Sequence, residues 1–286
     1  MKAENGAYAR WDHVSGLEEI FLKQRSKLHW LKVGDKNTKA FHSGIAARKN
    51  QNTIREVLQR RDGHVVDTTD EIQHEAEGFF KDFLQHVPQD YEGNSVENLS
   101  TLLPDKCTEE DSVLITSAVT GEEIRQMLFS MPNNKSPGPD GFNAEFFKKV
   151  WPIIGNDFTT AIQPFFEKGF LPKGINSTIL ALVPKKQSAT EMKDYRPISC
   201  CNVIYKVIAK IIANRLKGTL PSVISMNQPA FGKDRLLIEN LLLTTELVID
   251  YHKDSISSRY AIKVDISKAF DSVQWTFFCL RCLPRT

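Results

Sequence analysis

Asp265 is the residue of this sequence whose type and setting best suit chemistry. It interrupts a short, mostly apolar and partly β-branched run, 260–266, which is typical of a buried strand. An unpaired buried carboxylate is costly, so Asp265 is expected to serve a cation, a metal ion or a cap. The run is followed by Phe270, five residues after Asp265, and by Asp271. A strand that carries one acid and runs into an aromatic residue suits a metal-held phosphate.

Basic residues gather in a different part of the chain. Residues 62–125 contain 16 acidic and 3 basic side chains, whereas residues 168–217 contain 10 basic and 2 acidic ones. A positive segment of this kind suits a polyanionic partner, and a solvated lysine-rich face explains it equally well. The net charge of the whole chain is only +2, so it identifies no partner.

Length and composition are those of an ordinary globular protein. The 286 residues, 41% hydrophobic and 25% charged, suffice for one large domain or two ordinary ones. The five cysteines lack framework spacing and the single CxxC, Cys279 to Cys282, has no second pair, so reduced thiols are expected and zinc is not. No secretory signal is seen, and the most apolar helix candidate is interrupted by Glu239 and Glu246. These features predict an intracellular protein without a membrane span, in the nucleus or the cytoplasm.

Hydrophobic periodicity predicts a mostly helical N-terminal half. Helices are expected at 14–33, at 34–51, after a cap at Asp70, and at 121–130. An Asp62-Gly63 pair between two apolar runs predicts a hairpin. The acidic, turn-rich residues 87–112 predict a loop or linker.

The second half is expected to mix helices with short strands. The segment SPGPDG predicts a rigid irregular loop because it holds two prolines and two glycines. The expected elements after it are a helix at 143–166, a strand at 179–183, an extended segment at 195–199, a helix at 203–218 ended by Pro221, and a helix at 234–252. The predicted fold class is therefore α+β and helix-rich.

The order of five segments resembles the reverse transcriptase of non-LTR (LINE-type) retrotransposons, most of all the plant lineages. The segments are NKSPGPDG, ILALVPKK, DYRPISCCNVIYKVIAKIIANRL, NQPAFGKDR and AIKVDISKAFDSV. The preceding WLKVGDKNTKAFHSGIAARKNQNTI looks like the segment ahead of the polymerase in those plant elements. Each motif is weak alone, whereas five in the right order are a strong signal. The resemblance covers 28–278, nearly the whole chain.

This resemblance implies the reverse-transcriptase fingers and a partial palm, behind a helical N-terminal linker region. Residues 1–118 would be the linker, including the acidic loop 87–112, and residues 119–286 the reverse transcriptase domain. The family's later palm motifs, a glutamine–glycine box and an aromatic-Ala-Asp-Asp hairpin, do not occur in the sequence. We therefore expect a chain truncated after the first palm strand, with an incomplete polymerase fold and no activity of its own.

The catalytic residues are inferred from their match to the family's motifs. Asp265 matches the first catalytic aspartate, and with the backbone carbonyl of Ile266 it is expected to bind Mg²⁺, weakly because it is a single carboxylate. Phe270 matches the aromatic residue that leaves no room for a ribose 2′-hydroxyl, and a core phenylalanine is the competing reading. Asp271 is expected to pair or cap.

Basic residues match the family's nucleotide and nucleic-acid contacts. Arg196 matches the fingers arginine that contacts the incoming triphosphate, and Lys185 or Lys186 looks like its lysine companion. The competing reading is a solvated hairpin end. Nucleic-acid contacts are expected from Lys135 in the SPGPDG loop and from the basic helix that holds Lys206, Lys210, Arg215 and Lys217.

The implied function is RNA-directed DNA synthesis, the transfer of deoxynucleotides from dNTPs to a primer 3′-hydroxyl. The implied partners are an RNA template, a DNA primer and dNTPs, with Mg²⁺ as the cofactor. Three alternatives stay open: a non-catalytic RNA- or DNA-binding remnant, a relative of the group II intron maturases, and a helical interaction protein with accidental motif matches.

Overall fold

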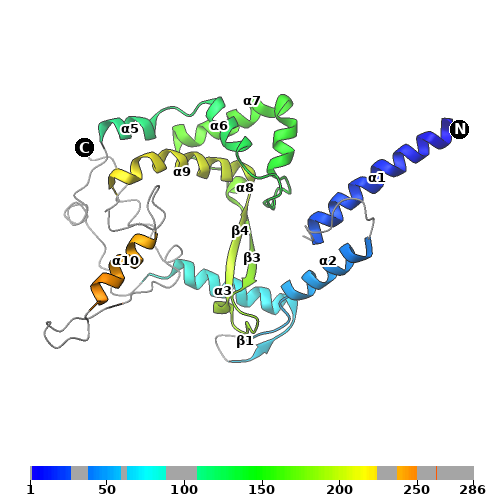
Figure 1. The fold of residues 1–286 in the computed structure, drawn as a ribbon, viewed down its shortest axis with the longest axis horizontal. Helices are drawn as coiled ribbons and strands as arrows, with labels where there is room; N and C mark the ends of the chain where they lie inside the picture. Colours follow the sequence, from blue (N-terminus) through cyan, green and yellow to red (C-terminus); the bar gives the residue numbers. More distant parts are fainter. Residues whose placement is uncertain are drawn as a thin grey trace. The chain divides into compact units, whose positions relative to one another are not determined.

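A computed structural model of the chain describes residues 2–26, 38–58, 63–87, 108–223, 237–249 and 262 (Figure 1). The described residues belong to two compact units. The first unit is drawn from Met1–Phe79, Asn133–Ser136 and Ile179–Cys200, and the second from Phe80–Pro132, Pro137–Thr178 and Cys201–Thr286. Each has its own apolar core. The division of the sequence at residue 118 stays a prediction.

Two helices pack together in the first unit, α1 (Lys2–Ser26) and α2 (Thr38–Asn52). Leu22 of α1 is 4% exposed and Phe41 of α2 is 2% exposed. Both predicted helices are confirmed where they are described, but α1 begins at Lys2 and not at residue 14, and residues 27–37 lie outside the described residues. The first residues include Ala, Lys and Glu, which favour a helix without apolar periodicity.

The predicted hairpin is confirmed as β1 (Val57–Leu58) and β2 (Val65–Val66), with Val57 opposite Val66. Helix α3 (Thr69–Gln85) follows it. The cap prediction was wrong: Thr68 Oγ1 accepts the backbone N–H of Glu71 at 3.4 Å, and Asp70 lies within the first turn. A side-chain cap comes from the residue before the helix, and an acid inside the first turn favours the helix dipole instead.

A second two-stranded sheet, made of β3 (Thr178–Pro184) and β4 (Tyr195–Cys201), completes the described β-structure. A short 3₁₀ turn, η1 (Met192–Asp194), leads into β4. One face of this hairpin joins β1, β2 and α3 in the core of the first unit. The buried members of that core are Val57, Val66, Ile72, Met192 and Tyr195.

The second unit is helical. Its elements are α5 (Glu109–Thr116), α6 (Gly121–Phe129), α7 (Ala144–Lys168), the short α8 (Lys173–Asn176) and α9 (Val203–Val223). The core between α6, α7 and α9 consists of Val119, Ile124, Leu128, Phe147, Phe158, Ile162, Val203, Val207, Ile208 and Ile211. The helices predicted at 121–130 and 143–166 are thereby confirmed.

Part of the predicted loop 87–112 is helical instead. Residues 109–112 form the start of α5, where Thr108 Oγ1 accepts the backbone N–H of Asp111 at 3.1 Å. A threonine followed three residues later by an acid is an N-terminal helix signal, which the acid-rich composition concealed. Residues 88–107 of that loop lie outside the described residues.

Three predictions concern the C-terminal part of the chain. Helix α9 continues past Pro221 to Val223, because a proline near a helix end removes only one hydrogen bond. Helix α10 (Leu237–Val248) lies within the predicted helix 234–252 and ends before Ile249, and residues 234–236 and 250–252 lie outside the described part of the chain. Of the predicted buried strand 260–266, only Ile262 is described, and it is outside any strand and 85% exposed. A strand needs a partner for its backbone groups, and Ile262 pairs with none of the described strands. No helix among the described residues is long and apolar enough to cross a bilayer.

Candidate functional site

The residues expected to carry out catalysis lie outside the described part of the chain. They are Asp265, with the Ile266 carbonyl, and Phe270, the predicted contact to the sugar; Asp271, which is expected to pair or cap, lies outside it as well. Among the described residues, no group of three or more His, Cys, Asp or Glu side chains is placed to hold a metal ion. Magnesium binding at Asp265 and the Ile266 carbonyl therefore stays a prediction.

The β3–β4 hairpin positions three of the predicted nucleotide-binding residues. Two contacts fix its ends: the backbone N–H of Lys185 donates to the carbonyl of Asp194 at 2.8 Å, and the side chains of Thr178 and Cys201 lie 3.5 Å apart. Both contacts fit a single antiparallel register. The register therefore fixes which side chains share a face of the hairpin.

In this register Arg196 lies opposite Val183, and Lys185 continues the same face. Positions diagonal across an antiparallel pair have Cβ atoms within about 8 Å. The side chain of Arg196 is exposed and has no hydrogen bond or ion pair to another described residue. The opposite face turns Tyr195 and Leu182 into the core of the first unit, where burial raises the pKa of Tyr195.

Asp194 organises the loop that connects the two strands. Its Oδ2 accepts the backbone N–H groups of Thr190 and Glu191 at 3.3 and 3.4 Å. The Lys186 ammonium lies 3.1 Å from the same oxygen. This bond from Lys186, together with the two backbone donors, holds the pKa of Asp194 below its ordinary value. The charge of Lys186 is therefore compensated within the loop.

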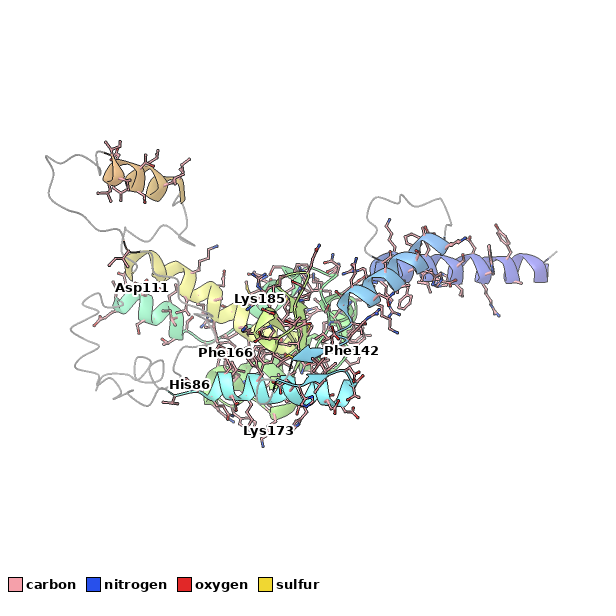
Figure 2. All side chains as sticks on the ribbon, turned by 90° about the horizontal axis from the view of Figure 1, so that it is seen from below. His86, Asp111, Phe142, Phe166, Lys173 and Lys185 are labelled. Carbon is pink, nitrogen blue, oxygen red and sulfur yellow. The ribbon has the colours of Figure 1, made fainter. Side chains whose placement is uncertain are left out.

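Lys185 (Figure 2) has a different partner. Its ammonium donates to the backbone carbonyl of Lys193 at 2.6 Å, which is a neutral group. The ammonium of Lys193 in turn lies 2.7 Å from the Glu191 carboxylate, whose hydrogen bond raises the pKa of Lys193. Of the two candidate lysines, Lys185 is thus the one whose ammonium forms no ion pair with a carboxylate of the described residues.

The basic residues of α9 lie on two different sides of the helix. Val207 and Ile211 are completely buried and mark the inner side. At about 100° per residue, Arg215 falls on one flank of that inner side, and Lys206 and Lys210 fall on the other flank. The helix therefore separates residues that the sequence presents as a single basic cluster.

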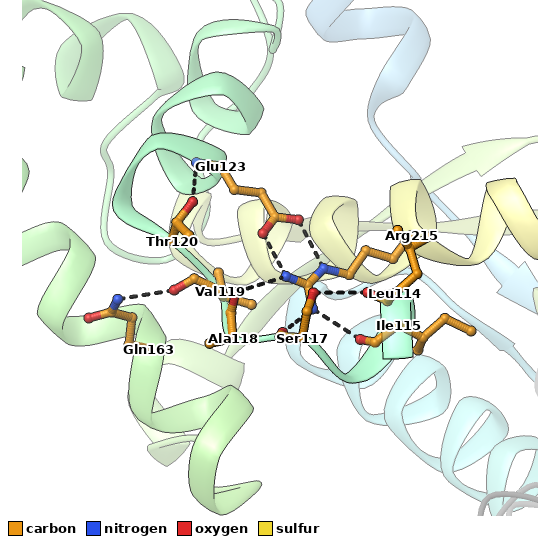
Figure 3. Close-up of polar contacts among 9 residues, drawn as sticks. All are labelled: Leu114, Ile115, Ser117, Ala118, Val119, Thr120, Glu123, Gln163 and Arg215. Carbon is orange, nitrogen blue, oxygen red and sulfur yellow. Dashed lines mark hydrogen bonds and ion pairs between the residues drawn. The ribbon is translucent and has the colours of Figure 1, made fainter. Parts of the chain in front are cut away.

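Arg215 is held by an intramolecular network (Figure 3). Its Nε and Nη2 donate to the Glu123 carboxylate at 2.9 and 2.7 Å, and its Nη1 donates to the carbonyls of Ile115 and Ser117 at 3.0 and 2.6 Å. The side chain is 9% exposed, and the bond to Glu123 raises the pKa of Arg215. A permanently charged fork that joins α5, α6 and α9 favours a structural role over the predicted nucleic-acid contact.

The SPGPDG loop is anchored on Asn202. The Asn202 side chain is buried, accepts the backbone N–H of Asp140 at 3.2 Å and donates to the carbonyl of Gly174 at 2.9 Å. A Cβ on Gly138 would lie 2.6 Å from the carbonyl carbon of Cys201 and closer still to Asn202. The predicted irregular loop is therefore confirmed. Lys135 is exposed.

Sequence reasoning missed three residues that organise these sites: Asn202, Glu123 and Asp194. Only Asn202 left a signal, since an asparagine directly before an apolar helix is a common N-cap. In the sequence, Glu123 and Asp194 resemble ordinary surface acids. Their partners, Arg215 and Lys186, are brought to them by the fold.

Comparison with known proteins identifies the domain. Residues 183–281 match the family model described as reverse transcriptase (RNA-dependent DNA polymerase). Over 249 residues the chain is 30% identical to the transposon TX1 uncharacterized 149 kDa protein of Xenopus laevis. The matched region is 87% of this chain and 19% of that protein.

Two relatives from Drosophila melanogaster match over about half of the chain. The retrovirus-related Pol polyprotein from the type-2 retrotransposable element R2DM is 28% identical, and the match covers 56% of this chain and 14% of that protein. The RNA-directed DNA polymerase from mobile element jockey is also 28% identical, and the match covers 55% of this chain and 17% of that protein. The chain thus spans less than a fifth of the length of these relatives. The predicted plant lineage and truncation stay predictions. The chain carries a reverse transcriptase domain homologous to the RNA-directed DNA polymerases of non-LTR retrotransposons.

Proposed function

We propose that this domain serves RNA-templated DNA synthesis, with an RNA template, a DNA primer and dNTPs as its substrates. The match of residues 183–281 to the reverse transcriptase family carries this proposal, because it includes the connecting loop and second strand of the hairpin and the VDISKAFD segment with Asp265. In this function Asp265 and the Ile266 carbonyl would supply oxygen ligands, the donor type that magnesium prefers. The metal would supply charge stabilisation at the transferred phosphoryl group.

The hairpin would bind the triphosphate through Lys185 and Arg196. Two cations on one exposed face can contact neighbouring phosphate oxygens, the guanidinium by two parallel hydrogen bonds. Lys186 is the poorer candidate, because moving its ammonium to a ligand would leave the carboxylate of Asp194 without its ion pair. Lys185 would give up only a bond to a carbonyl. We therefore assign the triphosphate contact to Lys185 and the loop-stabilising role to Lys186.

Photo-crosslinking of a labelled azido-dNTP to the full chain, with primed RNA template and Mg²⁺, tests this assignment. We expect crosslinking that unlabelled dNTP suppresses and that ribonucleotides suppress poorly, because of Phe270. Lys185→Ala and Arg196→Ala should each reduce the signal at least fivefold. The matched control is Lys149→Ala, which removes an exposed lysine from α7 and should leave it unchanged. The proposal would be refuted if the amount of crosslinked dNTP were the same without the template and in both substituted chains.

Primer extension by the same chain tests the expected lack of activity. With one of the three expected carboxylates in its sequence, the chain should yield no template-dependent product. An Mg²⁺-dependent product that disappears in Asp265→Ala would show that this expectation is wrong, while supporting the polymerase function itself.

A further inference from the structure

Helix α1 has an apolar side that the described residues leave uncovered. The helix lies beside α2 (Figure 1), and its buried or half-buried residues mark the side that faces α2. These residues are Ser15, Gly16, Glu19, Leu22, Lys23 and Ser26. At about 100° per residue, Val14, Leu17 and Phe21 are centred about 160° around the helix from them. All three are more than half exposed, so the outer side of α1 presents apolar side chains to solvent.

This outer side has the residue spacing of a seam between two helices. Val14, Leu17 and Phe21 follow one another at intervals of three and four residues, and Gln24 continues the series after three more. Residues at these intervals line up along one side of a helix and insert between the side chains of a second helix. Ile20 widens the apolar surface on one flank. The spacing therefore favours another helix as the occupant of this side.

Two opposite charges lie on the other flank of the seam. Glu18 and Arg25 are seven residues apart, which places them about 20° apart around the helix and about 10.5 Å apart along its axis. This distance is too long for an ion pair within one helix. Both side chains are exposed, and neither forms an ion pair with another described residue. The Arg25 guanidinium lies over the ring of Phe21, 5.3 Å from its centroid, and is thereby held beside the seam.

A second copy of α1 in the antiparallel orientation matches both the seam and the charges. Antiparallel helices bring the same flank of each copy together, so Glu18 of one copy can pair with Arg25 of the other, and two-fold symmetry forms this pair twice. With Leu17 opposite Phe21 of the second copy, the paired residues are offset by about 7.5 Å along the axis. Their side chains lean toward each other, because each leans toward its own N-terminus. In the parallel orientation, Arg25 would instead face Ile20 and stay unpaired.

We propose that the outer side of α1 is an interface between two copies of this chain. The copies pair as antiparallel helices, with Val14, Leu17 and Phe21 in the seam and two Glu18–Arg25 ion pairs beside it. The partner approaches α1 from the side opposite α2, so that the packing within each copy is kept. A seam of about three turns is small, and the dimer is therefore weak and reversible. This interface does not depend on the polymerase proposal, because it involves neither nucleic acid nor dNTP.

Sedimentation velocity of the full chain without nucleic acid, over a range of protein concentrations, tests this interface. We expect a monomer–dimer equilibrium in the wild-type chain. E18K replaces two ion pairs with two contacts between like charges and should raise the dissociation constant about tenfold. E18K/R25E exchanges the two charges and should return the dissociation constant to within about threefold of wild type. L17E places a carboxylate in the apolar seam and should abolish the dimer.

Two controls separate a specific dimer from unfolding and from general stickiness. I153E changes a more exposed apolar residue of α7 and should leave the equilibrium unchanged. Circular dichroism at 222 nm should be the same for L17E and wild type, because Leu17 is exposed in the single chain. A wild-type chain that stays monomeric at every concentration would overturn the proposal, as would a dimer that survives L17E. A dimer that E18K weakens and E18K/R25E fails to restore would overturn the antiparallel pairing on which the proposal rests.

Discussion

Replacement of Arg215 by alanine tests whether this residue is structural, as its network indicates. The substitution removes two hydrogen bonds to the Glu123 carboxylate and the bonds to the carbonyls of Ile115, Ser117 and Ala118. These carbonyls lie at the end of α5 and just beyond it, where intrahelical donors run out. The substitution therefore loosens α5 from α9 and leaves an acid without its partner.

The expected loss follows from burial. Removing one partner of a buried ion pair costs about 3–5 kcal/mol, because the other charge stays desolvated. Arg215 is 9% exposed but Glu123 is 23% exposed, so water can reach the carboxylate in the variant. We therefore expect R215A to lower the free energy of unfolding by about 2–3 kcal/mol, which is less than the loss for a fully buried pair. R215K keeps the charge without the fork and should lose about half as much.

Urea unfolding followed by circular dichroism at 222 nm measures this loss. A double-mutant cycle with E123A isolates the pair, and we expect a coupling energy of about 1–2 kcal/mol. A loss below about 0.5 kcal/mol for R215A is typical of a surface site and would refute the structural assignment. A coupling energy near zero would show that the carbonyls, and not Glu123, retain the guanidinium.

Three more predictions concern the SPGPDG loop, the core of the second unit, and the pH dependence of the loop between β3 and β4. Gly138→Ala should destabilise the chain by about 1–3 kcal/mol in urea, because its Cβ meets backbone atoms, whereas Gly174→Ala, with no atom within 4 Å of its Cβ, should be nearly neutral. Ile211→Ala should cost about 2–5 kcal/mol because the side chain is fully buried, and the 39% exposed Ile212 provides the matched control on the same helix. The lowered pKa of Asp194 stabilises the hairpin loop above the unfolded-state pKa of about 3.9, and this stabilisation is lost as the pH falls through the lower folded-state value. Chemical shifts of the loop amides should show that transition, and Asp194→Asn should abolish it.

Local sequence signals determined most of the described helices and the order of motifs. Apolar periodicity located α3, α6 and α7, and the Asp-Gly pair located the first hairpin. These features depend on neighbours within a few residues, and such information is written directly into a sequence. The family resemblance, carried by motif order, likewise needed no structure.

The roles of individual basic residues depended on the tertiary structure. Lys185 and Lys186 are adjacent in sequence, and only the folded loop brings Asp194 to one of them. Arg215 and Lys210 share one basic segment, and only the packing of α9 against α5 and α6 gives Arg215 its partner, Glu123. Each of these distinctions rests on a contact between side chains from different turns or helices. The sequence by itself determined the elements and the family, and the fold decided which charges are compensated within the protein and which face solvent.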